Sequence, residues 1–585
     1  MKDRLSERDD RPGFCISGAG GLPGAGGLFG AGRLRGGLSA LVLGTVLSGG
    51  FVESVSGNPL DGHVVSGSAS IGSDGTVMTV TQGTDRAVID WRSFSIGAGE
   101  TTRFVQPSAS SVTANRVTGG DPSSVLGSLK ANGTVVLVNR NGIVFGTDAR
   151  VDAGGLVATV HDLDTAGFMS GSDVLRFEGG ARPGASVVNH GTISVRDPVL
   201  SAFVAPHVRN EGVITADFGR VALASAKGFS VDLYGDGLLS FAPGDGLEET
   251  IGDGAEALVQ NGGTLAGSRV LLTAHAAREV VNASVNVSGL VRATSVSSRG
   301  GVITLGGSGS VRVSGRGRLD ASGSGGGGRV TIKAGPFSTD GTIDVRGVDA
   351  SGAAVARGGI VEITADGVML GGEITASGAS GGGVDVASRG VLSLAGRVEA
   401  QGLLGSGGSI GYRGRRVVET GTGSTSVSGL THGGTISVMA DQSIATSGSY
   451  AAGGVYGKGG RIDMSAPDVR LLSAGLEARG RQQGGLVRVG GGFQGARQLI
   501  RRRFIMTASS GGGALLPGLG PRHPRSSTMR RRSMSPRGRA PAGRQSSGRM
   551  IGRRSSAASM RAARLAGGRS RSPRPEICGA PGWPM

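Results

Sequence analysis

Gly358-Gly-Ile-Val-Glu-Ile-Thr364 contains the pattern that decides the fold of this 585-residue chain. Two glycines precede an alternation of Val361 and Ile363 with Glu362 and Thr364, which is typical of a half-buried β-strand. Eight such pairs occur: Gly300-Gly301, Gly327-Gly328, Gly358-Gly359, Gly382-Gly383, Gly407-Gly408, Gly433-Gly434, Gly459-Gly460 and Gly484-Gly485. The second glycines are 27, 31, 24, 25, 26, 26 and 25 residues apart, and a period of this length predicts a solenoid.

Each repeat unit carries a second short strand pattern, visible at residues 341–345, 372–376 and 396–400. A single coil cannot bury its apolar face, whereas coils stacked about 4.8 Å apart pair every strand and enclose the Val and Ile side chains. Leucine-rich repeats need a regular Leu grid, which is missing, and a calcium-binding β-roll needs Asp where Val311 stands. We therefore predict an all-β fold, a right-handed parallel β-helix.

The composition argues against a compact α/β enzyme. Glycine supplies 114 residues, apolar residues 38% and aromatic residues only 4%, too little for a large aromatic core. Seven histidines occur singly, so neither a metal site nor a cofactor is expected. Asp344, Glu362 and Asp385 fall at similar positions in successive units and could line up outside the helix, as glycosidase carboxylates must. Strand alternation places polar residues there anyway, and we predict no enzyme.

The first 57 residues are interpreted as an extended signal peptide region. Leu38–Leu47 is a ten-residue apolar run preceded by Arg33 and Arg35. It is too short to cross a bilayer as a helix but is typical of a signal-peptide core. A buried strand, or an artefact of an upstream start codon, is the alternative interpretation. Cys15 and Cys578 are the two cysteines, so residues 16–577 hold no disulfide framework.

The basic charge of the chain is concentrated at its C-terminal end. Residues 496–585 contain 20 Arg and one acid, Glu576, a balance of +19, whereas the rest of the chain balances to −1. This Arg-rich tail has no strand pattern and is predicted to be disordered, or to result from a frameshift. Because aromatic residues for base stacking are scarce in it, no nucleic-acid partner is expected.

Short strands also fill residues 58–165. The patterns at residues 76–81, 87–91, 102–106 and 134–138 are rich in β-branched residues and bounded by turn formers. In residues 134–138 both faces are apolar, as expected for a strand covered on both sides. A helical turn is predicted at Pro122–Leu129, with Asp121 as its N-cap.

Arg86–Gly146 resembles the haemagglutination-activity, or two-partner secretion, domain of filamentous haemagglutinin-like exoproteins. The similarity is densest in NRVTGG, Asn115–Gly120, and VNRNGI, Val138–Ile143. It implies a parallel β-helix, export through the periplasm, and passage through a dedicated outer-membrane β-barrel transporter. The residues implied to matter for secretion are Asn115, Arg116, Asn139, Asn141, Gly142 and Ile143.

Two roles stay open for these residues, shaping a turn and being recognised by the transporter. Asn-Gly favours a tight turn, and an Asn side chain bonds backbone amides two residues on. The family usually has Pro where this chain has Arg140. Loss of that proline enlarges the unfolded ensemble, at about 0.4–1 kcal/mol if the native φ suits proline.

The sequence thus predicts five segments and a secreted exoprotein. The segments are a signal region (1–57), a two-partner secretion domain (58–165), an irregular β-helix continuation (166–299), Gly-rich repeats (300–495) and the tail (496–585). An adhesin binding a host cell or matrix surface is the leading function. A stalk for a toxin or cytolysin whose effector end is missing, and a truncated inactive gene fragment, are the alternatives.

Overall fold

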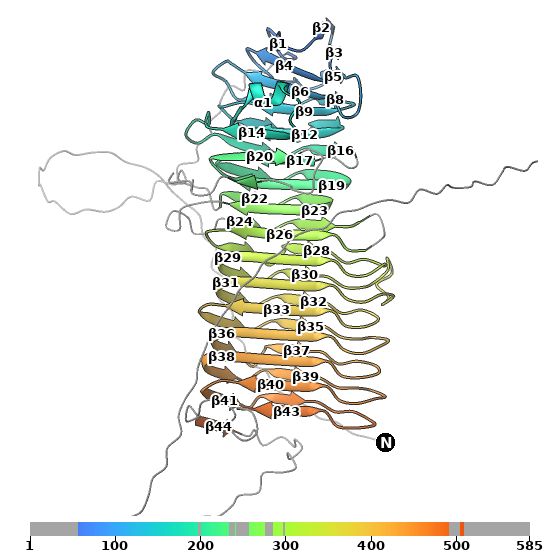
Figure 1. Ribbon diagram of the computed structural model, residues 1–585, viewed down its shortest axis with the longest axis vertical. Helices are drawn as coiled ribbons and strands as arrows, with labels where there is room; N and C mark the ends of the chain where they lie inside the picture. Colours follow the sequence, from blue (N-terminus) through green and yellow to red (C-terminus); the bar gives the residue numbers. More distant parts are fainter. Residues whose placement is uncertain are drawn as a thin grey trace, which may run out of the picture. The chain divides into compact units, whose positions relative to one another are not determined.

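The computed structural model describes residues 57–196, 200–232, 240–241, 257–274, 285–295, 299–490 and 503–507. Its strands fall into three ladders, here named A, B and C, and successive coils of the chain add strands to each ladder (Figure 1). Pairing within the ladders is parallel except at their start, where β1 pairs with β4 and β2 with β3 in antiparallel fashion. The predicted all-β parallel β-helix is confirmed. The signal region predicted before residue 57 lies outside the described residues.

Most strands belong to one ladder. Ladder A contains β1 (His63–Ser66), β4 (Arg86–Trp91), β6 (Val112–Val117), β9 (Thr134–Val138), β12 (Gly155–Thr159), β17 (Leu200–Val204), β26 (Val302–Gly307), β33 (Gly383–Ser388), β40 (Arg461–Ser465) and β43 (Leu486–Val489). Ladder B contains β7 (Ser123–Val125), β10 (Ile143–Phe145), β15 (Ser186–Asn189), β18 (His207–Asn210), β22 (Val259–Asn261), β24 (Val285–Val287), β27 (Val311–Val313), β34 (Val391–Leu394), β41 (Asp468–Leu472) and β44 (Arg503–Thr507). Ladder C contains β2 (Ala69–Asp74), β3 (Val77–Gln82), β5 (Thr101–Val105), β8 (Ser128–Ala131), β11 (Arg150–Ala153), β16 (Thr192–Val195), β25 (Leu290–Ala293), β28 (Arg318–Asp320), β30 (Thr342–Asp344), β32 (Glu373–Thr375), β35 (Arg397–Glu399), β37 (Ser424–Ser426), β39 (Ser449–Ala451) and β42 (Gly475–Glu477).

Six long strands bridge two ladders, and they change partners along the chain. β19 (Val213–Ser225) and β23 (Thr264–Ala274) run from ladder C into ladder A. β29 (Arg329–Thr339), β31 (Ile360–Leu370), β36 (Ser409–Glu419) and β38 (Thr435–Thr446) run from ladder A into ladder B. From β25 onward a loop therefore separates ladder C from ladder A, and the Gly-Gly pairs stand where this loop returns to ladder A.

The corner glycines stack directly on one another. A Cβ on Gly434 would lie 2.1 Å from the carbonyl oxygen of Gly408, so this position accepts no side chain. The register corrects one expected pair: Gly383 aligns with Ile360 and Ser409, so the corner glycine of that coil is Gly382. The intervals on either side of it become 23 and 26 residues, because the run of three glycines hid the true corner.

Most strands expected in residues 58–165 are present. β3, β4, β5 and β9 coincide with the predicted segments to within a residue or two. The helical turn predicted at Pro122–Leu129 is wrong. Val125 and Leu129 have helical spacing but are buried on two strands, β7 and β8, on either side of Gly127.

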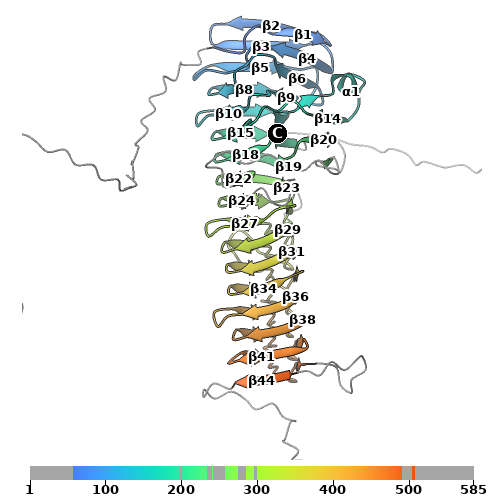
Figure 2. The ribbon, with the colours of Figure 1, turned by 90° about the vertical axis from the view of Figure 1, so that its left-hand side faces the viewer.

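A small second sheet covers ladder A near its N-terminal end (Figure 2). It consists of β13 (Asp162–Leu163), β14 (Val174–Glu178), β20 (Gly228–Asp232) and β21 (Ser240–Phe241), accompanied by α1 (Thr165–Met169). The side chain of Asp164 caps α1 by accepting the N–H of Gly167. Phe168, Phe177 and Phe229 pack in a core separate from the interior of the helix. This cover buries β9, β12 and β17 on both faces, as predicted for residues 134–138.

The described part of the tail departs from expectation at one point. Residues 496–585 were expected to lack strands, yet Arg503–Thr507 forms β44 and pairs in parallel with β41. The predicted disorder of the other tail residues lies outside the described residues. Among the residues that the structure describes, none forms a helix long and apolar enough to cross a bilayer.

Candidate functional site

The Asn139–Gly142 turn joins ladder A to ladder B. Its backbone closes through a bond of 3.1 Å from the N–H of Gly142 to the carbonyl of Asn139. The Oδ1 atom of Asn139 accepts the backbone N–H of Asn141 at 2.9 Å, the expected bond two residues on. Gly142 has φ of +116°, and a Cβ there would lie 3.1 Å from the carbonyl oxygen of Ser186. Glycine is therefore required by both conformation and space.

The side chains of this turn reach back to the preceding coil. Asn139 Nδ2 donates to the carbonyl of Asp121 and to Ser123 Oγ, both at 3.0 Å. Asn141 Nδ2 donates to the carbonyl of Gly119 at 3.0 Å. The two segments that carry the family resemblance are thus held together, because each turn amide bonds the loop that follows Asn115–Gly120.

Asn115 and Arg116 lie on β6 and point to opposite sides of ladder A. Asn115 is fully buried, and its Oδ1 accepts the indole N–H of Trp91 at 3.0 Å. Arg116 forms a two-pronged ion pair with Asp90, at 2.7 and 2.9 Å, and donates to Thr165 Oγ1 of α1 at 3.0 Å. Arg116 therefore links the helix wall to its cover, whereas Asn115 satisfies an indole inside the core.

Most of the six predicted residues are inaccessible in the folded chain. Asn115, Asn139 and Ile143 have no exposed side-chain surface, and Asn141 and Arg116 are partly exposed. The Oδ1 atom of Asn141 is buried without a hydrogen-bond partner. This geometry suits the turn-shaping role, and a part in secretion stays a prediction.

Sequence reasoning missed the acidic partners of the two arginines. Arg140, at the position of the family's proline, forms an ion pair with Asp162, and hydrogen bonding to this carboxylate raises the pKa of Arg140. The carbonyl of Arg140 also accepts the N–H of Arg182. Asp90 and Asp162 lie 26 and 22 residues from their partners, about one coil. An acid one coil away was thus the available signal for both pairs.

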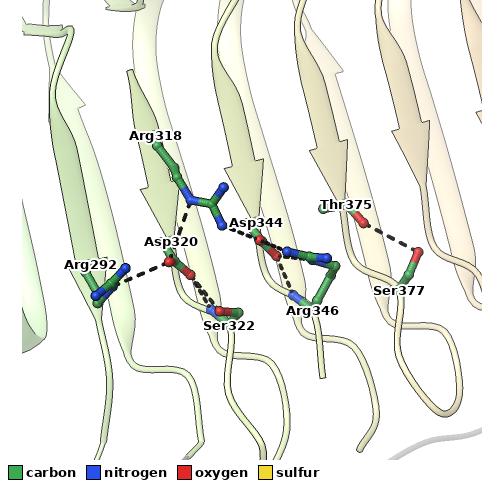
Figure 3. Close-up of polar contacts among 8 residues, drawn as sticks. All are labelled: Arg292, Arg318, Asp320, Ser322, Asp344, Arg346, Thr375 and Ser377. Atoms are coloured by element: carbon green, nitrogen blue, oxygen red, sulfur yellow. Dashed lines mark hydrogen bonds and ion pairs between the residues drawn. The ribbon is translucent and has the colours of Figure 1, made fainter. Parts of the chain in front are cut away.

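The three carboxylates suggested for glycosidase chemistry do not form one row. Glu362 and Asp385 are neighbours in ladder A, but Asp344 stands in ladder C. Figure 3 shows Asp344 between Arg318 and Arg346, each of which donates to it at 2.7 Å. Asp344 is 1% exposed and fully engaged in hydrogen bonds across neighbouring coils. It failed to join the row because its unit places it on the shorter strand, β30.

A second buried acid lies inside the helix without a cation beside it among the described residues. Glu419 occupies an inward position between Leu394 and Thr446 in ladder B and is 3% exposed. Its Oε2 accepts the hydroxyl of Thr446 at 2.9 Å, and Tyr450 donates to the same hydroxyl at 3.3 Å. Burial raises the pKa of Glu419 above its ordinary value, and burial likewise raises the pKa of Tyr450.

The described residues contain no group of three or more His, Cys, Asp or Glu placed to hold a metal ion. His161 is buried at the junction between β12 and the second sheet, with its Nδ1 3.1 Å from the carbonyl oxygen of Gly179. Desolvation lowers the pKa of His161, so the ring is held neutral there. His275 and His523 lie outside the described residues.

Comparisons with known proteins point to one class. Residues 57–321 match the family model described as the TPS secretion domain, and the match extends past residue 165, where we expected that domain to end. A heme/hemopexin-binding protein of Haemophilus influenzae is 32% identical over 272 residues, covering 46% of this chain and 29% of that protein. A second H. influenzae protein of the same description is 39% identical over 126 residues, covering 21% of this chain and 14% of its own length.

Two solved structures are also similar. The HMW1 secretion domain of H. influenzae is 20% identical with a TM-score of 0.43, covering 74% of this chain and 100% of that chain. A filamentous hemagglutinin secretion domain is 11% identical with a TM-score of 0.30, covering 55% and 100%. The chain spans less than a third of the length of the two curated relatives.

Proposed function

We propose, from the premise that this chain is a two-partner secretion exoprotein, that it is an adhesin presented at the cell surface or released from it. The match of residues 57–321 to the TPS secretion domain carries the proposal. The family implies a partner, the outer-membrane β-barrel transporter of the pathway. The β-helix supports adhesion because stacked coils present a long, regular surface to a host cell or matrix.

Passage through the envelope follows from how the coils pair. Export by the signal region delivers the chain to the periplasm, and the transporter receives residues 58–165. Each coil outside the cell pairs with the coil before it, as β36 pairs with β33 and then with β38. Burial of the inward Val and Ile side chains, at roughly 25 cal/mol per Å², opposes back-sliding.

The six predicted residues support secretion through the fold of the domain. Asn139, Asn141 and Gly142 close the turn onto the preceding coil, and Arg116 fastens the wall to α1. The surface that the transporter recognises then depends on this packing.

Secretion with the paired transporter tests the proposal. Deletion of residues 58–165 retains the chain in the periplasm, whereas deletion of residues 409–434, one coil from corner glycine to corner glycine, leaves secretion intact. Equal secretion of both variants rejects the assigned role of residues 58–165. Purified secreted chain then binds cultured host cells or matrix, and absence of any attachment rejects the adhesin.

Heme or hemopexin binding is a second candidate, favoured by the printed description of the two curated relatives. Titration of the secreted chain with heme, followed by visible absorbance, and with hemopexin, followed by co-sedimentation, separates it from adhesion. A toxin stalk and an inactive gene fragment are distinguished by sequencing the downstream DNA in all three frames.

A further inference from the structure

Exposed apolar side chains gather on the loops that return from ladder C to ladder A. We define four corner loops, residues 401–408, 428–434, 453–460 and 479–485. The side chains of Leu403, Leu404, Val455 and Tyr456 are 48%, 60%, 57% and 56% exposed, and Leu430 between them is half-buried. These five residues form what we name the apolar ridge. Contiguous exposed apolar surface of this kind marks a site of interaction.

The ridge is ordered by the same stacking that builds the helix. Gly402, Gly429, Gly454 and Gly480 form parallel bridges with one another, so the residues that follow them stand in register. Leu403, Leu430 and Val455 therefore occupy one column, and Leu404, Thr431 and Tyr456 the next. Figure 1 shows loops projecting along one edge of the β-helix beyond β35 and β39.

Backbone amides at the ridge are already satisfied within the helix. The N–H groups of Leu404 and Tyr456 donate to the carbonyls of Ala379 and Leu430, both at 3.0 Å. Those of Leu403 and Val455 donate to Gly378 and Gly429. A loop that enters lipid must bond its polar backbone groups internally, since hydrocarbon offers no partner. These loops meet that condition at each of the four exposed apolar residues.

The charge around the ridge has one sign. The four corner loops contain Lys458, Arg479 and Arg481 but no Asp or Glu. Arg479 pairs with Glu477 on β42, whereas no ion pair is formed by Lys458 or Arg481 within the described residues. Basic residues that flank exposed Leu, Val and Tyr fit an anionic lipid surface, where the cations meet headgroups and the apolar side chains enter the acyl boundary.

We propose that the apolar ridge inserts into the interface of an anionic lipid bilayer, with Lys458 and Arg481 against its headgroups. The inference names the surface contacted by the proposed adhesin and so rests on that function. A protein partner or a second copy of this chain is the competing occupant, and the test below separates them.

The test places a tryptophan at the ridge in the full-length chain. In a Trp583→Phe background, which removes the tryptophan of the Arg-rich tail, Tyr456→Trp reports on the ridge, since Trp91 is buried. The matched control is Met369→Trp, because Met369 is 60% exposed on the sheet away from the corner loops. Both variants meet vesicles of phosphatidylcholine and phosphatidylglycerol in equal parts, with acyl chains brominated for quenching.

We expect quenching and a blue shift at position 456 and neither at position 369. Replacing Leu403, Leu404 and Val455 by Ser in the Tyr456→Trp variant reduces quenching on the order of tenfold. Co-sedimentation with vesicles while position 456 stays unquenched shows binding through other parts of the chain and overturns the inference. A fluorescence change that follows protein concentration without vesicles identifies a second copy as the occupant and overturns it as well.

Cell attachment is measured in parallel so that the two proposals fail separately. Attachment to host cells without quenching rejects the lipid inference and leaves the adhesin standing. Quenching without attachment rejects the adhesin and leaves the lipid contact standing.

Discussion

At the scale of single residues, side chains of one coil satisfy groups on the next. Asn189, Asn210 and Asn261 illustrate this: each of the first two donates its amide to the next at 2.8 Å. The amide column is buried, so each member replaces a water that cannot enter. The turn at Asn139 uses the same principle toward the preceding coil.

Replacing Asn139 by Ala should lower the free energy of unfolding by about 2–3 kcal/mol, because the buried groups it bonds lose their partners. Urea unfolding followed by circular dichroism measures the change. Arg140→Ala is the matched control, since its ion pair with Asp162 is largely exposed and contributes below about 1 kcal/mol. Equal losses in both variants would contradict the structural role of Asn139.

Glu419 should make stability depend on pH. Its ordinary pKa is 4.5, and burial raises the pKa in the folded chain. Below pH 4.5 the carboxyl is neutral in both states; as the pH rises toward the raised pKa, only the unfolded chain ionises freely, so stability falls. Glu419→Gln should raise the melting temperature above that window and leave it unchanged below. An unchanged pH slope in Glu419→Gln would remove this residue as the cause.

At the scale of the element, the corner glycines and the second sheet impose different constraints. A corner glycine is fixed by the carbonyl of the coil before it, whatever the loop between them does. The second sheet instead covers a wall that would otherwise expose Val136, Val157 and Ala202.

Gly382→Ala and Gly383→Ala, at adjacent positions, should differ sharply. A Cβ on Gly382 would lie 2.1 Å from the carbonyl oxygen of Gly359, whereas on Gly383 its nearest neighbour is Ser409 Oγ at 3.6 Å. We expect a loss of about 3 kcal/mol or more for the first and less than about 1 kcal/mol for the second. Thermal unfolding of both variants measures this, and the reverse order would refute the register.

Phe177→Ala should loosen the second sheet. Phe177 is buried and stacked on Phe229 with ring centroids 4.6 Å apart. The substitution should cost about 3–4 kcal/mol and increase binding of a hydrophobic dye. Val174→Ala, at a 38%-exposed position of the same strand, is the control and should change neither signal.

The sequence was sufficient for elements whose pattern is local. Thr134–Val138 was recognised as a doubly covered strand because both of its faces are apolar. α1 was missed because it has five residues with Gly167 among them. The second sheet was missed because β14 and β20 are far apart in the chain. At the candidate site the turn was predictable, but the acceptors of Asn139 Nδ2 come from the preceding coil, which only the register places.

At the scale of the whole described helix, stability should be graded along the coils. Inner coils are paired on both sides, as β36 is with β33 and β38, whereas β43 pairs with β40 and its residues are exposed or half-buried. Because each coil contacts mainly its neighbours, opening begins at an end. Hydrogen exchange should be slowest in β29 to β38 and fastest in β43. Uniform exchange along these strands would contradict a graded solenoid.

The stacked corner glycines also govern how such a chain can change size during evolution. Adding or removing a few residues on a wall would turn inward-facing side chains outward in every neighbour they meet, and the carbonyl at the next corner would meet a Cβ. Duplicating or losing one entire turn restores each contact. Genuine kin should therefore differ in length by multiples of a single turn, with odd remainders confined to the protruding loops.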